Sequence, residues 1–176
     1  PFSFAWVERK IPESRVLKVS FDIMAEQTGY GNLQIDFADA EGIPCARVEF
    51  TDSIMRAKGG ARYSQMGKYS PGEIYHIDVE LSVGNRNYTV YINGKKKTTR
   101  MFFAPVPGIE RIIFRTGSIN SIPTPDTPAD QYFDLENAGQ EETPATYRIA
   151  RLRTSGDRTA NLLDFNDYRH YIDYFN

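Results

Sequence analysis

The chain has 176 residues, a length that suits one domain of ordinary size and is tight for two. Its content of 40% hydrophobic and 25% charged residues excludes a disordered or fibrous chain, and its net charge of −2 argues against nucleic acid or an anionic membrane as a partner. One cysteine and two histidines exclude a disulfide framework and a metal centre built from Cys or several His. No apolar run approaches the roughly 20 residues that span a bilayer, so we expect no membrane span.

Hydrophobic and polar residues alternate along most of the chain, which predicts β-strands with one buried face. The pattern is regular in residues 16–25, 32–37 and 45–50, and clearest between Ile74 and Phe103. There Asn93-Gly94 predicts a type I′ hairpin turn, because both central positions of that turn need positive φ. Further strands are expected at 111–115 and 147–154. Many short antiparallel strands predict an all-β fold, a two-sheet antiparallel sandwich.

The alternation is interrupted in two places. Residues 117–143 are rich in proline and then in acidic residues, which is typical of a long functional or mobile loop. Beyond Gly156, hydrophobic residues recur at helical spacing. We therefore expect a sandwich over 1–155 and a helical linker, or the start of a following domain, over 156–176. The chain begins at Pro1 without an initiator Met, which we interpret as a piece of a longer or processed protein.

Two segments resemble known families. Residues 75–81 with 88–95, which end in Tyr-Thr-Val-Tyr-Ile-Asn-Gly-Lys, resemble the hairpin of concanavalin A-like jelly rolls, the laminin-G-like and lectin-like domains. Residues 168–176 resemble the lead-in to a helical toroid domain of multidomain bacterial glycoside hydrolases. Together the resemblances imply an accessory sandwich in front of the catalytic domain of a polysaccharide-degrading enzyme. They imply a periplasmic, cell-surface or secreted location, with a glycan and the adjacent catalytic domain as partners.

The strand His76-Ile77-Asp78-Val79-Glu80 resembles the catalytic strand of family 16 glycoside hydrolases. Asp78 and Glu80 would project from one face, and a retaining mechanism needs two carboxyl groups about 5–5.5 Å apart. His76, however, stands where that family has its nucleophilic Glu, and a His cannot form the usual glycosyl ester. The sequence therefore favours a solvated strand face and no catalytic residue in this domain. A divergent glycoside hydrolase or lyase using Asp78 and Glu80 remains the enzymatic alternative.

A sugar site would combine aromatic faces with polar side chains that hydrogen-bond to hydroxyl groups. Candidate platforms are Tyr30, Tyr63, Tyr91 and Trp6, although most aromatic residues of such strands pack in or against a sheet, and Trp6 is expected to pack so. The leading hypothesis is a non-catalytic carbohydrate-binding or structural accessory domain. A laminin-G-like protein–protein adhesion module is a further alternative.

No cofactor is expected, and a structural calcium ion is the one alternative. Carboxylate oxygens suit calcium, and Asp126, Asp130 and Asp134 lie together in the long loop. Their spacing is not that of an EF-hand, which favours a solvated acidic loop. The basic cluster Lys95-Lys96-Lys97 follows the hairpin turn directly, where charges discourage edge-to-edge association of strands.

Overall fold

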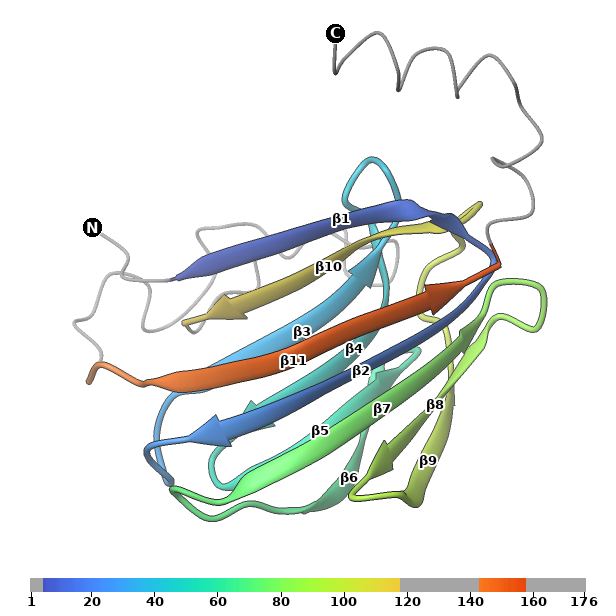
Figure 1. The fold of residues 1–176 in the computed structure, drawn as a ribbon. Coiled ribbons are helices and arrows are strands. Elements are labelled where there is room, and N and C mark those ends of the chain that lie inside the picture. Colours follow the sequence, from blue (N-terminus) through green and yellow to red (C-terminus); the bar gives the residue numbers. More distant parts are fainter. Residues whose placement is uncertain (1–4, 118–142, 158–176) are drawn as a thin grey trace, which may run out of the picture.

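A computed structural model describes residues 5–117 and 143–157, and these residues form two antiparallel sheets packed face to face (Figure 1). The six-stranded sheet has the order β1 (Trp6–Ser14), β10 (Ile109–Thr116), β3 (Asn32–Ala38), β4 (Pro44–Thr51), β5 (Ile54–Gly59), β6 (Arg62–Lys68). The five-stranded sheet has the order β11 (Tyr147–Gly156), β2 (Val16–Ala25), β7 (Ile74–Ser82), β8 (Asn87–Ile92), β9 (Lys95–Met101). The predicted two-sheet sandwich is confirmed.

The core lies between the two sheets and is built from the alternate apolar residues of their strands. Phe21 of β2 meets Phe114 of β10 edge to face across the sandwich, with ring centroids 5.6 Å apart. Their neighbours Ile23 and Ile35 are fully buried. Each such side chain contributes roughly 1.5–3 kcal/mol by leaving water. Because period-2 alternation sends the intervening residues outward, each sheet presents a polar outer face.

The hairpin between β8 and β9 has the predicted conformation, since φ is 50° at Asn93 and 73° at Gly94. Lys95, Lys96 and Lys97 are exposed on β9, which is an edge strand of the five-stranded sheet. Their place agrees with a role in discouraging edge pairing. Cys45 is buried in β4.

Strands β1, β5 and β6 were not identified from the sequence. The β6 segment Arg-Tyr-Ser-Gln-Met-Gly-Lys lacks regular alternation, because a bulge shifts its register against β5 between Met55 and Arg56. A sheet edge also needs fewer apolar residues than its centre does.

Several predictions fall on parts of the chain outside the described residues. These are the calcium candidates Asp126, Asp130 and Asp134, most of the proline-rich loop, and the helix expected after residue 157. Within 5–117 and 143–157, no group of three or more His, Cys, Asp or Glu is arranged to hold a metal ion. The same residues contain no helix long and apolar enough to cross a membrane.

Candidate functional site

The outer face of the six-stranded sheet carries two rows of aligned side chains, which we call the polar face. Strand register places each residue of a row opposite the next on the neighbouring strand. The first row is Trp6, Arg115, Gln34, Glu49, Arg56 and Gln65. The second row is Glu8, Ile113, Asp36, Arg47, Lys58 and Tyr63. Charged residues rarely lose most of their exposure, and this face holds several that do.

A buried ion pair stands in the second row. The Arg47 guanidinium donates from Nε to Asp36 Oδ1 at 2.6 Å and from a terminal nitrogen to Oδ2 at 3.0 Å. Only 1% of Asp36 and 8% of Arg47 is exposed. Burial by itself would lower the pKa of Arg47, but the adjacent Asp36 carboxylate raises it by more. Arg47 therefore stays charged, and its bidentate contact with Asp36 has the geometry that gives strong and directional hydrogen bonds.

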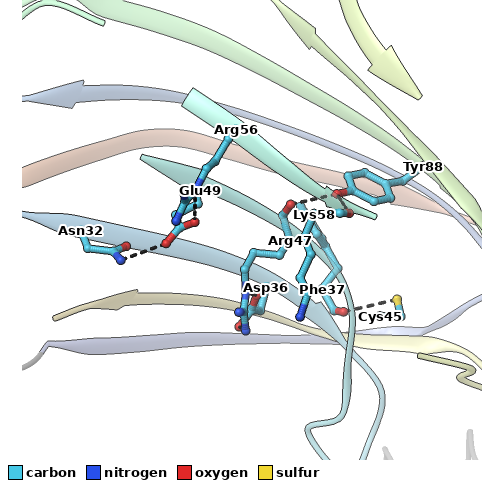
Figure 2. Close-up of polar contacts among 9 residues, drawn as sticks. All are labelled: Asn32, Asp36, Phe37, Cys45, Arg47, Glu49, Arg56, Lys58 and Tyr88. Atoms are coloured by element: carbon cyan, nitrogen blue, oxygen red, sulfur yellow. Dashed lines mark hydrogen bonds and ion pairs between the residues drawn. The ribbon is translucent and has the colours of Figure 1, made fainter. Parts of the chain in front are cut away.

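A second network is centred on Glu49 of the first row (Figure 2). Glu49 accepts hydrogen bonds from Asn32 Nδ2 at 2.9 Å and from Arg56 Nε at 2.6 Å. Burial acts to lower the pKa of Arg56, and the Glu49 carboxylate more than offsets it, so the net pKa is raised. The Arg56 guanidinium then lies over the Tyr63 ring, 4.2 Å from its centroid. Asn32 thus fixes Glu49, Glu49 fixes Arg56, and Arg56 fixes the ring of Tyr63.

Tyr88 supports this arrangement from the opposite sheet (Figure 2). Its ring is fully buried, and its hydroxyl lies 2.8 Å from the carbonyl oxygen of Arg47 and 2.5 Å from that of Lys58. A phenol has one proton, so it donates to one carbonyl at a time. Because burial raises the pKa of Tyr88, the hydroxyl remains a donor. It holds the β4 and β5 backbones directly beneath the side chains of the second row.

Exposed aromatic rings stand at the two edges of the polar face. Trp6 on β1 is 42% exposed and Tyr63 on β6 is 38% exposed. Trp6 is more open than expected, because β1 is an edge strand; the Arg115 guanidinium lies 5.4 Å from its ring centroid. Two of the four predicted platforms are therefore brought onto one face. Tyr30 lies apart in the β2–β3 loop, and Tyr91 lies on the other sheet.

The Asp78 and Glu80 carboxylates lie on the outer face of the five-stranded sheet. Glu80 pairs with Lys18 Nζ at 2.8 Å and accepts a hydrogen bond from the Tyr91 hydroxyl at 3.3 Å. The Lys18 hydrogen bond lowers the pKa of Glu80, whereas a general acid of a glycosidase needs a raised pKa. Asp78 lies 3.3 Å from His76 Nε2. These contacts fit the solvated strand face that the sequence favours, and they add ion pairs to it.

The buried charges of the polar face were not predicted from the sequence. In the alternating pattern of their strands, the positions of Asp36, Arg47 and Glu49 are those expected to face solvent. A usable signal was present, since opposite charges stand at alternate positions of consecutive strands, as in Asp36 and Arg47-Val48-Glu49. Such residues can pair across a ladder once the register is known.

A family model described as "Sialidase-like, CBM domain" matches residues 1–131 of the chain. A search of curated proteins found no match. Among solved structures, one named "Sialidase" is 50% identical over 100% of this chain, with a TM-score of 0.79, and the chain spans only 17% of that structure's length.

More distant structures resemble the chain as well. Sheep galectin-11 is 13% identical with a TM-score of 0.52, and the alignment covers 85% of this chain and 96% of the galectin. A family 7 alginate lyase is 10% identical with a TM-score of 0.55, over 84% of this chain and 64% of the lyase. These two likenesses show the fold alone, and they agree with a concanavalin A-like jelly roll.

Proposed function

Because the chain belongs to the sialidase-like carbohydrate-binding module family, we propose that it binds glycan through the polar face and does so without catalysis. The observation that carries the proposal is the joint placement of Arg56, Tyr63 and Gln65 at one end of that face. All three are accessible: the Arg56 side chain is 32% exposed, and Tyr63 and Gln65 are exposed. A stacking ring, a guanidinium and an amide are the groups that a sugar site requires.

Accessible and buried residues have different roles in this proposal. Arg56 uses one of its five N–H donors on Glu49, so others remain for sugar hydroxyls. Tyr63 offers ring surface to the apolar face of a sugar. Glu49 is only 2% exposed, and we assign it the positioning of Arg56 rather than contact with the glycan. Because Glu49 holds Arg56 and Arg56 in turn holds the Tyr63 ring, this part of the site is preorganised, which lowers the entropic cost of binding.

We further propose that this domain accompanies a catalytic domain in a polysaccharide-degrading enzyme that acts outside the cytoplasm. Support comes from the family match and from the 50% identical sialidase, whose chain extends far beyond the region aligned here. The division into a sandwich over 1–155 and a helical connection over 156–176 belongs to the same proposal. On this basis the domain concentrates the enzyme on its polysaccharide, an effect that depends on linker length.

A glycan array followed by titration calorimetry on the strongest hit tests the proposal. Tyr63→Ala and Arg56→Gln should each weaken binding at least tenfold, corresponding to the loss of about 1.4 kcal/mol. Tyr30→Ala is the matched control, because Tyr30 is 43% exposed but lies in the β2–β3 loop away from the polar face. Full binding by both polar-face variants, or the loss of binding in Tyr30→Ala, would contradict the assignment. No binding to any glycan would leave a purely structural accessory role.

A further inference from the structure

A second binding feature lies on the outer face of the five-stranded sheet, on the side of the sandwich opposite the polar face. It is an open groove of about 620 Å³ that crosses β11, β2, β7 and β8. Its lining includes Lys18, Ser20, Asp78, Glu80, Tyr91 and Arg153. The family match covers residues 1–131, which leaves out β11, and it assigns nothing to this groove.

Strand register explains the hollow. Arg153, Ser20, Asp78 and Tyr91 stand opposite one another on four consecutive strands. At about 4.8 Å per strand, the backbones of Arg153 and Tyr91 are roughly 14 Å apart. Ser20, the smallest side chain of the row, lies between these two long ones. The short Ser20 side chain therefore forms the bottom of the groove, with the Arg153 guanidinium at one end and the Tyr91 ring at the other.

The guanidinium reaches this face because β11 contains a bulge. Between Ala150 and Arg153 the strand has one residue more than its partner β2, and Arg151 takes the left-handed value φ 54°. Without the extra residue, Arg153 would alternate toward the core. With it, Leu152 packs against the core while Arg153 is exposed on the outer face. An arginine held at positive φ is costly, and backbone strain of this kind clusters at functional sites.

Ionic contacts hold the bulge in place. Arg151 donates to the Asp22 carboxylate, and Asp22 also lies 2.7 Å from His76 Nδ1. Arg153 itself has no ion-pair or hydrogen-bond partner within residues 5–117 and 143–157. The other cation in the groove, Lys18, is already paired with Glu80. Arg153 is thus the groove cation that can take a ligand's anion.

Tyr91 is positioned at the other end of the groove. Its hydroxyl donates to Glu80, which fixes the direction of the ring, and the side chain is half-buried. Asp78 and Ser20 lie between the ring and Arg153 and can hydrogen-bond to sugar hydroxyls. The groove therefore offers stacking, hydroxyl recognition and a bidentate donor in sequence along one row.

We propose that this groove is a second glycan-binding site, for a short oligosaccharide that carries a carboxylate on one sugar. The carboxylate pairs with the Arg153 guanidinium, adjacent hydroxyls bond to Ser20 and Asp78, and a further sugar ring stacks on Tyr91. Since the groove and the polar face lie on opposite sheets, the domain is bivalent. The groove site does not depend on the polar face.

The test uses an array of oligosaccharides ending in a uronic acid or in sialic acid, with the same glycans after reduction of the carboxyl group. Ser20→Leu fills the groove, and Arg153→Gln removes the charge without changing an interior residue. Each should weaken the binding of at least one acidic glycan tenfold or more, and the carboxyl-reduced glycan should bind the unmodified chain tenfold more weakly. Tyr63→Ala should leave this binding unchanged.

Arg148→Gln serves as the matched control, because Arg148 is exposed on the same strand but pairs with Glu26 outside the groove. Melting temperatures equal to that of the unmodified chain confirm that the variants fold. If the melting temperature of Ser20→Leu is lower, the test of the second site rests on Arg153→Gln alone. Full binding of every glycan by both groove variants would overturn the second site. If Tyr63→Ala nevertheless loses the binding of a glycan held by the polar face, the proposed function stands without the second site. Equal binding of acidic and carboxyl-reduced glycans would overturn the contact with Arg153.

Discussion

Replacing Asp36 by Asn should destabilise the sandwich by about 3 kcal/mol, because it leaves the Arg47 guanidinium charged and buried without its anion. The magnitude follows from burial: the Asp36 side chain is 1% exposed and that of Arg47 is 10% exposed, so water replaces little of the lost interaction. Two short hydrogen bonds, at 2.6 and 3.0 Å, are weakened together. For a chain of this size, each kcal/mol lowers the melting temperature by about 2–4 °C. We therefore expect a fall of about 6–12 °C.

Thermal unfolding followed by circular dichroism measures this shift. Lys18→Gln provides the matched control, because it breaks the Lys18–Glu80 pair at 2.8 Å, whose side chains are 67% and 43% exposed. An exposed pair of this kind contributes at most about 1 kcal/mol. If Asp36→Asn lowers the melting temperature no more than Lys18→Gln does, the argument from burial is wrong. The double variant Asp36→Leu with Arg47→Met should recover most of the loss, since it removes both charges.

Three further predictions concern other parts of the fold. Tyr88→Phe should cost about 1–3 kcal/mol in urea unfolding, because it leaves the carbonyls of Arg47 and Lys58 without their buried donor; unchanged stability would contradict the role of the hydroxyl. The hydrogen bond to Asp22 raises the pKa of His76 above its ordinary 6.5, so the stability it contributes is complete below about pH 6.5 and is lost as the pH rises through the higher folded value. Melting temperatures between pH 5.5 and 8.5 should show this loss in the unmodified chain and not in His76→Gln, and parallel curves would refute it. Gly94→Ala should lower the free energy of unfolding by about 1 kcal/mol in calorimetry, because φ is 73° there. Gly84→Ala is the control and should cost less, since a Cβ atom at Gly84 would meet no atom within 4 Å and its φ is ordinary. Equal losses of stability would argue against the turn.

Much of the fold could be predicted because it depends on local pattern. Alternation along β2, β7 and β8 identifies their buried faces, and Asn93-Gly94 specifies a turn that only positive φ permits. The weak edge strand β6 could not be found in this way, since a bulge breaks its alternation.

The candidate site was less accessible from sequence, because it depends on which strands become neighbours. Trp6 and Tyr63 are 57 positions apart in the chain, and nothing local shows that they stand on one sheet face. The pairing of Asp36 with Arg47 depends on the β3–β4 register, which the hydrophobic pattern of the two strands sets. Likewise, Arg153 is exposed on the outer face because of the bulge in β11, and no residue type in that strand predicts a bulge. Residue types therefore suggested which aromatic side chains could contact a sugar, whereas the pairing of the strands determines which of these side chains share a sheet face.

The central claim, that the polar face binds glycan, is tested most directly by mapping amide chemical shifts in NMR spectra as the strongest array glycan is added. We expect the largest shifts on β5 and β6, around Arg56, Tyr63 and Gln65, with saturation at the dissociation constant measured by calorimetry. The Tyr63→Ala variant should lose these shifts. If every glycan that binds tightly, neutral and acidic alike, leaves the amides of β5 and β6 unshifted, the account is contradicted.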